Sequence, residues 1–259
     1  MEDKMTEEDK TIFISGRDQV IENTDYMGNL YARKIHADGR PYHTFRTETV
    51  LCDGENIKFI NCSFSNNAGP GKRVGQAIAL YLDGDGITLE NCRICGHQDT
   101  LFLAPLPLKE HEKDGFLGPK QYGPRTDRVF YFKNCLITGG VDFIFGGAEA
   151  YFDDCEFRNV ESGYVFAPCT PEGRKGFTAR NCRFTAEKDV PAGSCYIARP
   201  WREHAYVRLE NCFLGEHIAK AGWKIWSEEY SVAGVRFSET GSYGPGAGQD
   251  LRPSWVLVD

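Results

Sequence analysis

Apolar and polar residues alternate along this chain in short segments, and one such segment recurs six times. In each copy, alternating apolar and polar residues lead up to an Asn-Cys or Asp-Cys pair. The copies are IKFINCSF, ITLENCRI, VFYFKNCLI, AYFDDCEF, FTARNCRF and VRLENCFL, around Cys62, Cys92, Cys135, Cys155, Cys182 and Cys212. A period of two is typical of strands with one buried face, and no segment carries the sustained i, i+3, i+4, i+7 stripe of an amphipathic helix. The pattern predicts an all-β protein made of repeated units.

The spacing of the repeats selects the architecture. Successive repeat cysteines are 30, 43, 20, 27 and 30 residues apart. Loops of variable length on a constant coil explain this irregular period, whereas a propeller or a Greek-key sandwich, the alternatives, would have more uniform units. We therefore predict a right-handed parallel β-helix, a solenoid whose turns bury their inward residues against one another. Cysteine is small and often buried, so the repeat cysteines should form an inward ladder.

One segment breaks the strand pattern. Residues 104–127 are rich in Pro, Gly and charged residues and account for the longest spacing. We interpret them as a loop insertion in a single β-helix domain that covers residues 1–259. The insertion is either a solvated excursion from one coil or a mobile flap beside the active site, since it begins five residues after Asp99.

Two aspartates occupy equivalent places in neighbouring repeats. Asp99 lies seven residues after Cys92, and Asp142 lies seven residues after Cys135. Adjacent parallel strands are about 4.8 Å apart, so equal offsets should bring the two carboxyl groups together. Two close carboxylates do not both ionise easily, which yields an acid and a base at one pH. Aspartates at strand ends often only accept turn hydrogen bonds, but the apolar and glycine-rich surroundings of Asp142 favour chemistry.

Several ordered motifs resemble one family. The segments GQAIAL (75–80), GHQDTLF (96–102), GGVDFIFGGA (139–148) and ARPW (198–201), with GWKIW (222–226) and GPGA (244–247) after them, resemble the signature blocks of pectin methylesterases in the same order. The similarity covers roughly residues 11 to 250. It implies the single-stranded β-helix of the pectin-lyase type and the hydrolysis of methyl esters of galacturonate, in pectin or oligogalacturonides, without a metal or other cofactor.

The resemblance also implies roles for five polar residues. Asp142 matches the nucleophile, and Asp99 matches the general acid that then becomes the base. Arg199 matches the arginine that holds the nucleophile in its ionised form. Gln76 and Gln98 match the amides that stabilise the oxyanion, a task for which neutral donors are well suited.

Aromatic residues near these motifs are candidates for sugar binding. Trp201 matches a family aromatic at the substrate cleft, where an indole stacks on a sugar face; ordinary core packing is the alternative. Phe143, Trp223 and Trp226 are weaker candidates of the same kind, and for Phe143 a structural role is slightly favoured.

Composition narrows the range of partners. The net charge is −7 and the pI is near 5.5, which argues against nucleic acid and against anionic membranes. The partner that the resemblance implies is methylated galacturonan or oligogalacturonide. The pair Cys92 and Cys95 lacks a second pair of ligands at comparable spacing, so no metal site is predicted. The ten cysteines are interpreted as mostly buried thiols of a reducing compartment.

The start of the chain bears on localisation. Residues 1–10 (MEDKMTEEDK) are mostly charged and are followed by no signal-peptide-like apolar run. As written, the chain is expected to be cytoplasmic, with a shortened N-terminal cap compared with the family; a start further upstream would make a secreted protein equally compatible.

Two other functions remain open from the residues alone. The first is a β-helix that binds uronate-containing saccharides without turnover. The second is an esterase for another sugar ester.

Overall fold

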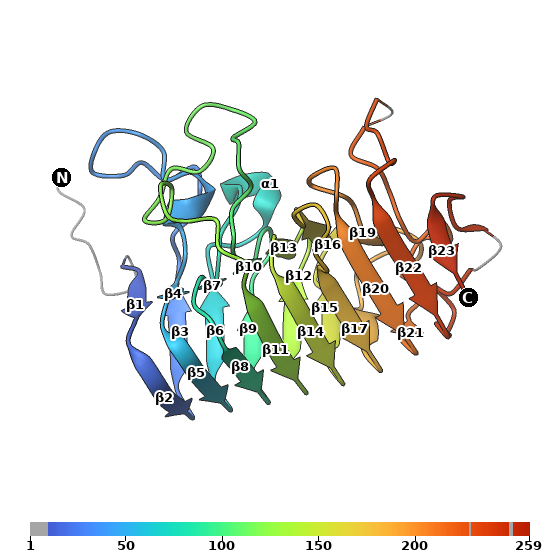
Figure 1. Cartoon of the computed structure of the whole chain (residues 1–259), viewed down its shortest axis with the longest axis horizontal. Coiled ribbons are helices and arrows are strands. Elements are labelled where there is room, and N and C mark those ends of the chain that lie inside the picture. The colour runs from blue at the N-terminus through green and yellow to red at the C-terminus, as the bar shows by residue number, and fades with distance from the viewer. Residues whose placement is uncertain (1–9, 228, 249–250) are drawn as a thin grey trace.

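The protein is built almost entirely of short parallel strands. The structure, a computed structural model, describes residues 10–227, 229–248 and 251–259. Over these residues the chain visits three sheets in turn, and every strand pairs in parallel with the equivalent strand of the next coil (Figure 1). A parallel neighbour cannot be reached through a hairpin, so the chain winds around a common axis. The predicted parallel β-helix is confirmed, and the propeller and the sandwich are excluded.

The three sheets run the length of the solenoid. Sheet A contains β1 (Ile12–Ile14), β4 (Val50–Cys52), β7 (Leu80–Leu82), β10 (Leu101–Leu103), β13 (Ile144–Gly146), β16 (Tyr164–Pro168) and β19 (Tyr196–Ala198). Sheet B contains β2 (Arg17–Glu22), β5 (Glu55–Ile60), β8 (Ile87–Glu90), β11 (Val129–Lys133), β14 (Glu149–Asp153), β17 (Phe177–Arg180), β20 (Tyr206–Glu210), β22 (Arg236–Thr240) and β23 (Val256–Val258). Sheet C contains β3 (Asp25–Gly28), β6 (Ser63–Asn66), β9 (Arg93–Cys95), β12 (Leu136–Gly139), β15 (Glu156–Asn159), β18 (Arg183–Ala186) and β21 (Phe213–Leu214). Two short helices, η2 (Thr44–Arg46) and α1 (Gly71–Val74), lie in the connecting loops.

The repeated Asn-Cys unit is a corner between two strands rather than the end of one. In the first copy, β5 ends at Ile60 and β6 begins at Ser63, with Asn61 between them. The residue before the cysteine has φ between 51° and 56° in all six copies. Asparagine and aspartate tolerate this left-handed conformation better than other residues with a side chain. Stacked corners also bond to each other, as Asn134 Nδ2 does to Asn91 Oδ1 at 2.7 Å.

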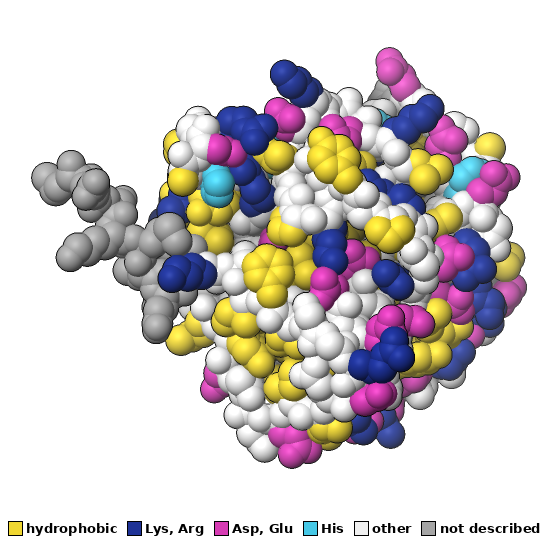
Figure 2. Space-filling view, turned by 60° about the vertical axis from the view of Figure 1, so that its left-hand side comes forward, with side chains coloured by type: hydrophobic (Ala, Val, Ile, Leu, Met, Phe, Trp, Pro, Cys, Tyr) yellow, Lys and Arg dark blue, Asp and Glu magenta, His cyan; other side chains and the backbone are white. Residues whose placement is uncertain are grey.

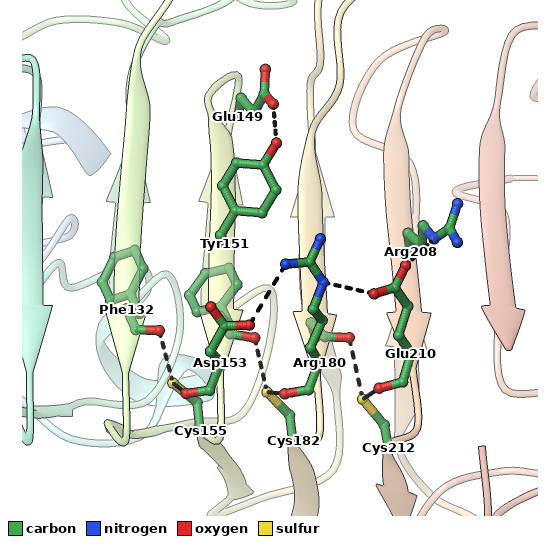
Figure 3. Close-up of polar contacts among 12 residues, drawn as sticks. Phe132, Glu149, Tyr151, Asp153, Cys155, Arg180, Cys182, Arg208, Glu210 and Cys212 are labelled. Carbon is green, nitrogen blue, oxygen red and sulfur yellow. Dashed lines mark hydrogen bonds and ion pairs between the residues drawn. The ribbon is translucent and has the colours of Figure 1, made fainter. Parts of the chain in front are cut away.

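The cysteine that follows each corner points into the solenoid. All ten cysteines are free thiols, and only Cys95 is not fully buried. Each repeat thiol donates to a carbonyl of the preceding coil, for example Cys155 to Phe132 O at 3.6 Å and Cys182 to Phe152 O at 3.3 Å (Figure 3). The predicted inward ladder is confirmed, because a small thiol fills the corner and still has a hydrogen-bond partner.

A second, smaller core lies outside sheet A. The outward residues Leu51, Tyr81, Phe102 and Phe145 are aligned from coil to coil and are buried beneath two loops. These loops, residues 29–47 and 104–127, lie on the same side of the solenoid (Figure 1). Their side chains complete the cluster with Phe45, Leu106 and Phe116. Burial of this face creates a wall beside which a cleft can form.

The surface carries charges of both signs. On the face shown in Figure 2, Lys and Arg side chains are interspersed with Asp and Glu side chains. In the part of the chain that the structure describes, no helix is long and apolar enough to cross a membrane.

Candidate active site

The two predicted aspartates lie one above the other on the outer side of sheet A. Each is two residues before a strand, and those strands, β10 and β13, pair with Leu101 opposite Ile144. The Asp99 N–H donates to Val141 O at 3.0 Å, which joins the two coils at this level. The vertical stacking expected from the equal sequence offsets is confirmed.

Both aspartates have a left-handed backbone. Their φ values are 61° for Asp99 and 52° for Asp142. This conformation turns the chain sharply into the strand and presents the carboxyl group on the outside, while the next residue points inward. Asparagine adopts the same conformation readily, so an Asp-to-Asn change preserves the turn.

Arg199 holds Asp142 through two hydrogen bonds. Its Nε lies 2.8 Å from Oδ1 and its Nη2 lies 2.6 Å from Oδ2 of the carboxylate. Arg199 follows β19, two coils from β13, and the residue between them on the outer face is Ala167. A methyl group at that place leaves room for the long side chain to reach across. A bidentate pair of this kind orients the carboxylate and favours its charged form.

The guanidinium is also held between two aromatic rings. It lies 4.1 Å from the ring centre of Tyr164 and 3.8 Å from that of Trp226. Tyr164 is in turn stacked on Tyr196 at 5.4 Å. Stacking of this kind stabilises a cation and limits the rotamers of its side chain. Tyr164 was not among the residues predicted from the sequence.

Burial and neighbouring charges shift the pKa values of the two carboxyl groups to different extents. Burial raises the pKa of Asp99 well above its ordinary value; the neighbouring Asp142 raises it further, and Arg199 and Gln98 oppose the rise. Burial also raises the pKa of Asp142, and there the hydrogen bonds and charge of Arg199 oppose it. The larger rise at Asp99 and the arginine beside Asp142 favour the proton of the pair on Asp99 and the negative charge on Asp142.

Two amides complete the polar part of the site. Gln76 and Gln98 both line the cavity that contains the two aspartates. The Gln98 side chain packs against Gly71 in α1, where an added Cβ would lie 2.3 Å from Gln98 Oε1. Glycine at position 71 thus provides the space for this amide.

The cavity over the aspartates is small, with a volume of about 200 Å³. Its apolar walls include Phe45, Phe116, Trp201 and Trp226. Trp201 makes an edge contact with Phe116 at 6.5 Å and lies 5.8 Å from Phe145. A cavity with aromatic walls and a few convergent polar groups is typical of a ligand site. Among the described residues, no group of His, Cys, Asp and Glu side chains could hold a metal ion.

Two of the four aromatic candidates do not contact this cavity, which corrects the expectation for them. Phe143 is fully buried in the main core, because after the left-handed turn at Asp142 both Phe143 and Ile144 face the inside of the solenoid. Trp223 is also buried, and its Nε1–H donates to Glu239 at 2.6 Å. Trp201 and Trp226 do line the cavity.

The wall formed by Phe45 and Phe116 was missed from the sequence. Neither residue belongs to a repeat unit, and both come from loops whose path depends on the outer face of sheet A. His97, which belongs to the GHQDTLF motif, places its Nδ1 3.2 Å from Glu161 Oε1 and does not line the cavity.

The aromatic clamp on Arg199 leads to a first prediction. Tyr164→Ala should lower kcat about fivefold, because a cation–π contact is worth about 1 kcal/mol when partly buried. It should also shift the acid limb of the pH profile upward, since a less restrained Arg199 lowers the pKa of Asp142 less. Tyr164→Phe keeps the ring and should behave like the wild type in both measurements. An unchanged pH profile in Tyr164→Ala would show that the ring only packs.

Fold and site together define a class of protein: a parallel β-helix with an arginine-held pair of carboxylates on one sheet. The family model Pectinesterase matches residues 9–106 and 122–258 of the chain. Over 259 residues the chain is 30% identical to "Probable pectinesterase 30" of Arabidopsis thaliana, covering 96% of this chain and 45% of that protein. The chain therefore belongs to the pectinesterase family, and it spans about half the length of the curated relatives it matches.

Solved structures show the same fold. Pectin methylesterase from carrot superposes with a TM-score of 0.74 at 22% identity, over 96% of this chain and 78% of that one. A pectin methylesterase in complex with a hexasaccharide superposes with a TM-score of 0.71 at 20% identity, over 96% of this chain and 82% of that one.

Proposed function

We propose that the protein hydrolyses methyl esters of galacturonate residues in pectin or oligogalacturonides. The observation that carries the proposal is Asp142, held by two hydrogen bonds from Arg199, in the same aromatic-walled cavity as the buried Asp99. A charged carboxylate next to a carboxylic acid can attack an ester and protonate the group that leaves. Membership of the pectinesterase family supports the same chemistry.

In the first half of the reaction, an Asp142 oxygen attacks the C6 carbonyl carbon of the ester. Negative charge develops on the carbonyl oxygen, and the side-chain amides of Gln76 and Gln98 are the neutral donors beside it. When the bond to the methoxy group breaks, Asp99 gives its proton to the departing oxygen. Methanol leaves, and an acyl group remains on Asp142.

In the second half, Asp99 is ionised and serves as the base. It takes a proton from a water molecule, whose oxygen attacks the acyl carbon. The bond to Asp142 breaks, the free galacturonic acid is released, and both aspartates return to their initial states. No step of this cycle requires a metal ion.

Sugar rings would contact the aromatic part of the cavity. Trp201 and Trp226 line it beside the catalytic pair, and flat indoles pack well against sugar faces. A related pectin methylesterase is in complex with a hexasaccharide, which supports a saccharide of several residues as the partner.

Methanol release tests this function. Wild-type protein should liberate methanol from methylated pectin or methylated oligogalacturonides, with one new carboxyl group for each methanol. Binding of these saccharides without methanol would support the non-catalytic alternative. Release of another acid or alcohol from other sugar esters, with none from methyl galacturonate, would contradict the substrate class.

A further inference from the structure

One part of the cleft wall lies outside the match to the family model. The family model leaves residues 107–121 unmatched, and these residues approach the catalytic aspartates closely. His111, Glu112, Gly115 and Phe116 all line the same cavity as Asp99 and Asp142. We call this segment, residues 107–121, the bridge. The repeat pattern of the sequence gives no indication of its effect on the cleft.

The bridge is attached on one side to the N-terminal coils. Phe116 is buried and meets Phe45 edge-on at 5.9 Å. Gly118 packs so closely that an added Cβ would lie 1.8 Å from the Phe45 carbonyl oxygen. Lys120 Nζ lies 2.7 Å from Asp53 Oδ2. Apolar packing, close backbone contact and an ion pair together anchor this end.

The bridge is attached on the other side to the loop that follows Arg199. Arg202 Nη2 donates to Lys109 O at 3.3 Å. The Arg202 guanidinium lies 4.7 Å from the centre of the Trp201 ring, and Trp201 in turn contacts Phe116. The segment therefore crosses the cleft from one wall to the other.

The bridge is also braced from within. Arg125 donates hydrogen bonds to four backbone carbonyls, those of Pro107, Lys120, Gln121 and Gly123. One guanidinium thus ties together the beginning and the end of the segment. Such a network favours a fixed wall over the mobile flap considered from the sequence.

Cavities lie on more than one side of the bridge, beside sheet A. A second cavity of about 650 Å³ lies next to the catalytic one. The two cavities share His111, Trp201 and Arg202 in their walls. The bond from Arg202 to Lys109 O and the contact of Trp201 with Phe116 join the two walls at this place, and we interpret them as a partition. A third cavity shares Thr44, Gln76, Glu112 and Gly115 with the catalytic one.

We propose that the bridge ends the substrate cleft at Trp201, so that the protein acts on methyl esters close to one end of short oligogalacturonides rather than inside the polymer. The inference rests on the proposed esterase function and specifies its substrate. A long polysaccharide that presents an internal ester must leave the site in both directions. A partition on one side admits only a chain that stops there.

Length dependence in the wild type is the primary test. We expect kcat/KM per methyl ester to be about tenfold higher on oligogalacturonides of three to six sugars than on methylated polymer. Mass spectrometry of a fully methylated hexamer should find the first lost ester at the same chain end in all molecules. Equal kcat/KM for polymer and oligomer, or first loss at internal positions, would overturn the proposal whether or not any variant folds.

A shortened bridge supplies the second test. Replacement of residues 108–119 by a short Gly-Ser linker should raise kcat/KM on polymer about tenfold and change that on trimers little. Lys113→Ala, at the exposed tip and outside the cavity walls, should keep the wild-type ratio. A folded shortened variant with an unchanged ratio would contradict the bridge's role. Absence of methanol from every substrate would instead reject the proposed function.

Discussion

Asp142→Asn should lower kcat by about four orders of magnitude or more, because an amide cannot act as the nucleophile. The change should leave the fold intact, since asparagine accepts the left-handed backbone of this position as readily as aspartate. Initial rates of methanol release, with circular dichroism and thermal unfolding on the same preparation, measure both effects. Substantial activity in a folded Asp142→Asn would refute a covalent role for this residue.

Two further variants make this result interpretable. Asp99→Asn removes the acid but keeps the nucleophile, so its loss should be about 10²- to 10⁴-fold. Asp154→Asn is the matched control, because Asp154 has the same left-handed backbone, with φ of 55°, but lies exposed at a corner of the solenoid. Its activity should equal that of the wild type. A loss in the control would mean that the turn, not the chemistry, is what the substitution disturbs.

Arg199→Lys should lower kcat/KM about 100-fold and move the acid limb of the pH profile to higher pH. A lysine keeps the charge but cannot make two parallel hydrogen bonds to Asp142 or stack as a plane between Tyr164 and Trp226. Since Arg199 opposes the rise in the pKa of Asp142, a weaker partner lets that pKa rise further. The nucleophile then becomes protonated at a higher pH.

The complete pH profile shows in which direction each of the two carboxyl groups limits the rate. The proposed mechanism requires an ionised Asp142 and a protonated Asp99, so the wild-type rate should fall toward acid pH as Asp142 gains a proton. The rate should fall toward alkaline pH as Asp99 loses its proton. Because the two carboxyl groups interact, the two apparent pKa values of the profile describe the pair and not either residue alone. In Arg199→Lys the acid limb should shift upward. An acid limb that stays in place while kcat/KM falls would show that Arg199 acts on substrate binding rather than on the nucleophile.

Periodicity in the sequence was sufficient for the fold and for the catalytic pair. Alternating residues and the Asn-Cys or Asp-Cys corner recur in six successive coils, and in a solenoid each coil contacts only its neighbours. Equal offsets from Cys92 and Cys135 therefore become equal heights on adjacent coils, which is why Asp99 and Asp142 could be placed together. The family motifs then supplied Arg199 and the two glutamines, all of which lie at the cavity.

The walls of the cleft depended on contacts that no repeat encodes. Whether an aromatic residue faces the cavity is decided by the path of the connecting segments beside the strands, and this placed Trp201 and Trp226 at the cavity and Phe143 in the core. The position of the bridge is decided by the outer face of sheet A, where Phe116 is buried against residues distant in sequence. The sequence alone determined the coil and its paired carboxylates, because these follow from local repetition. Only the tertiary structure decided which loop residues line the cleft, because loops of unequal length pack by side-chain contacts across coils.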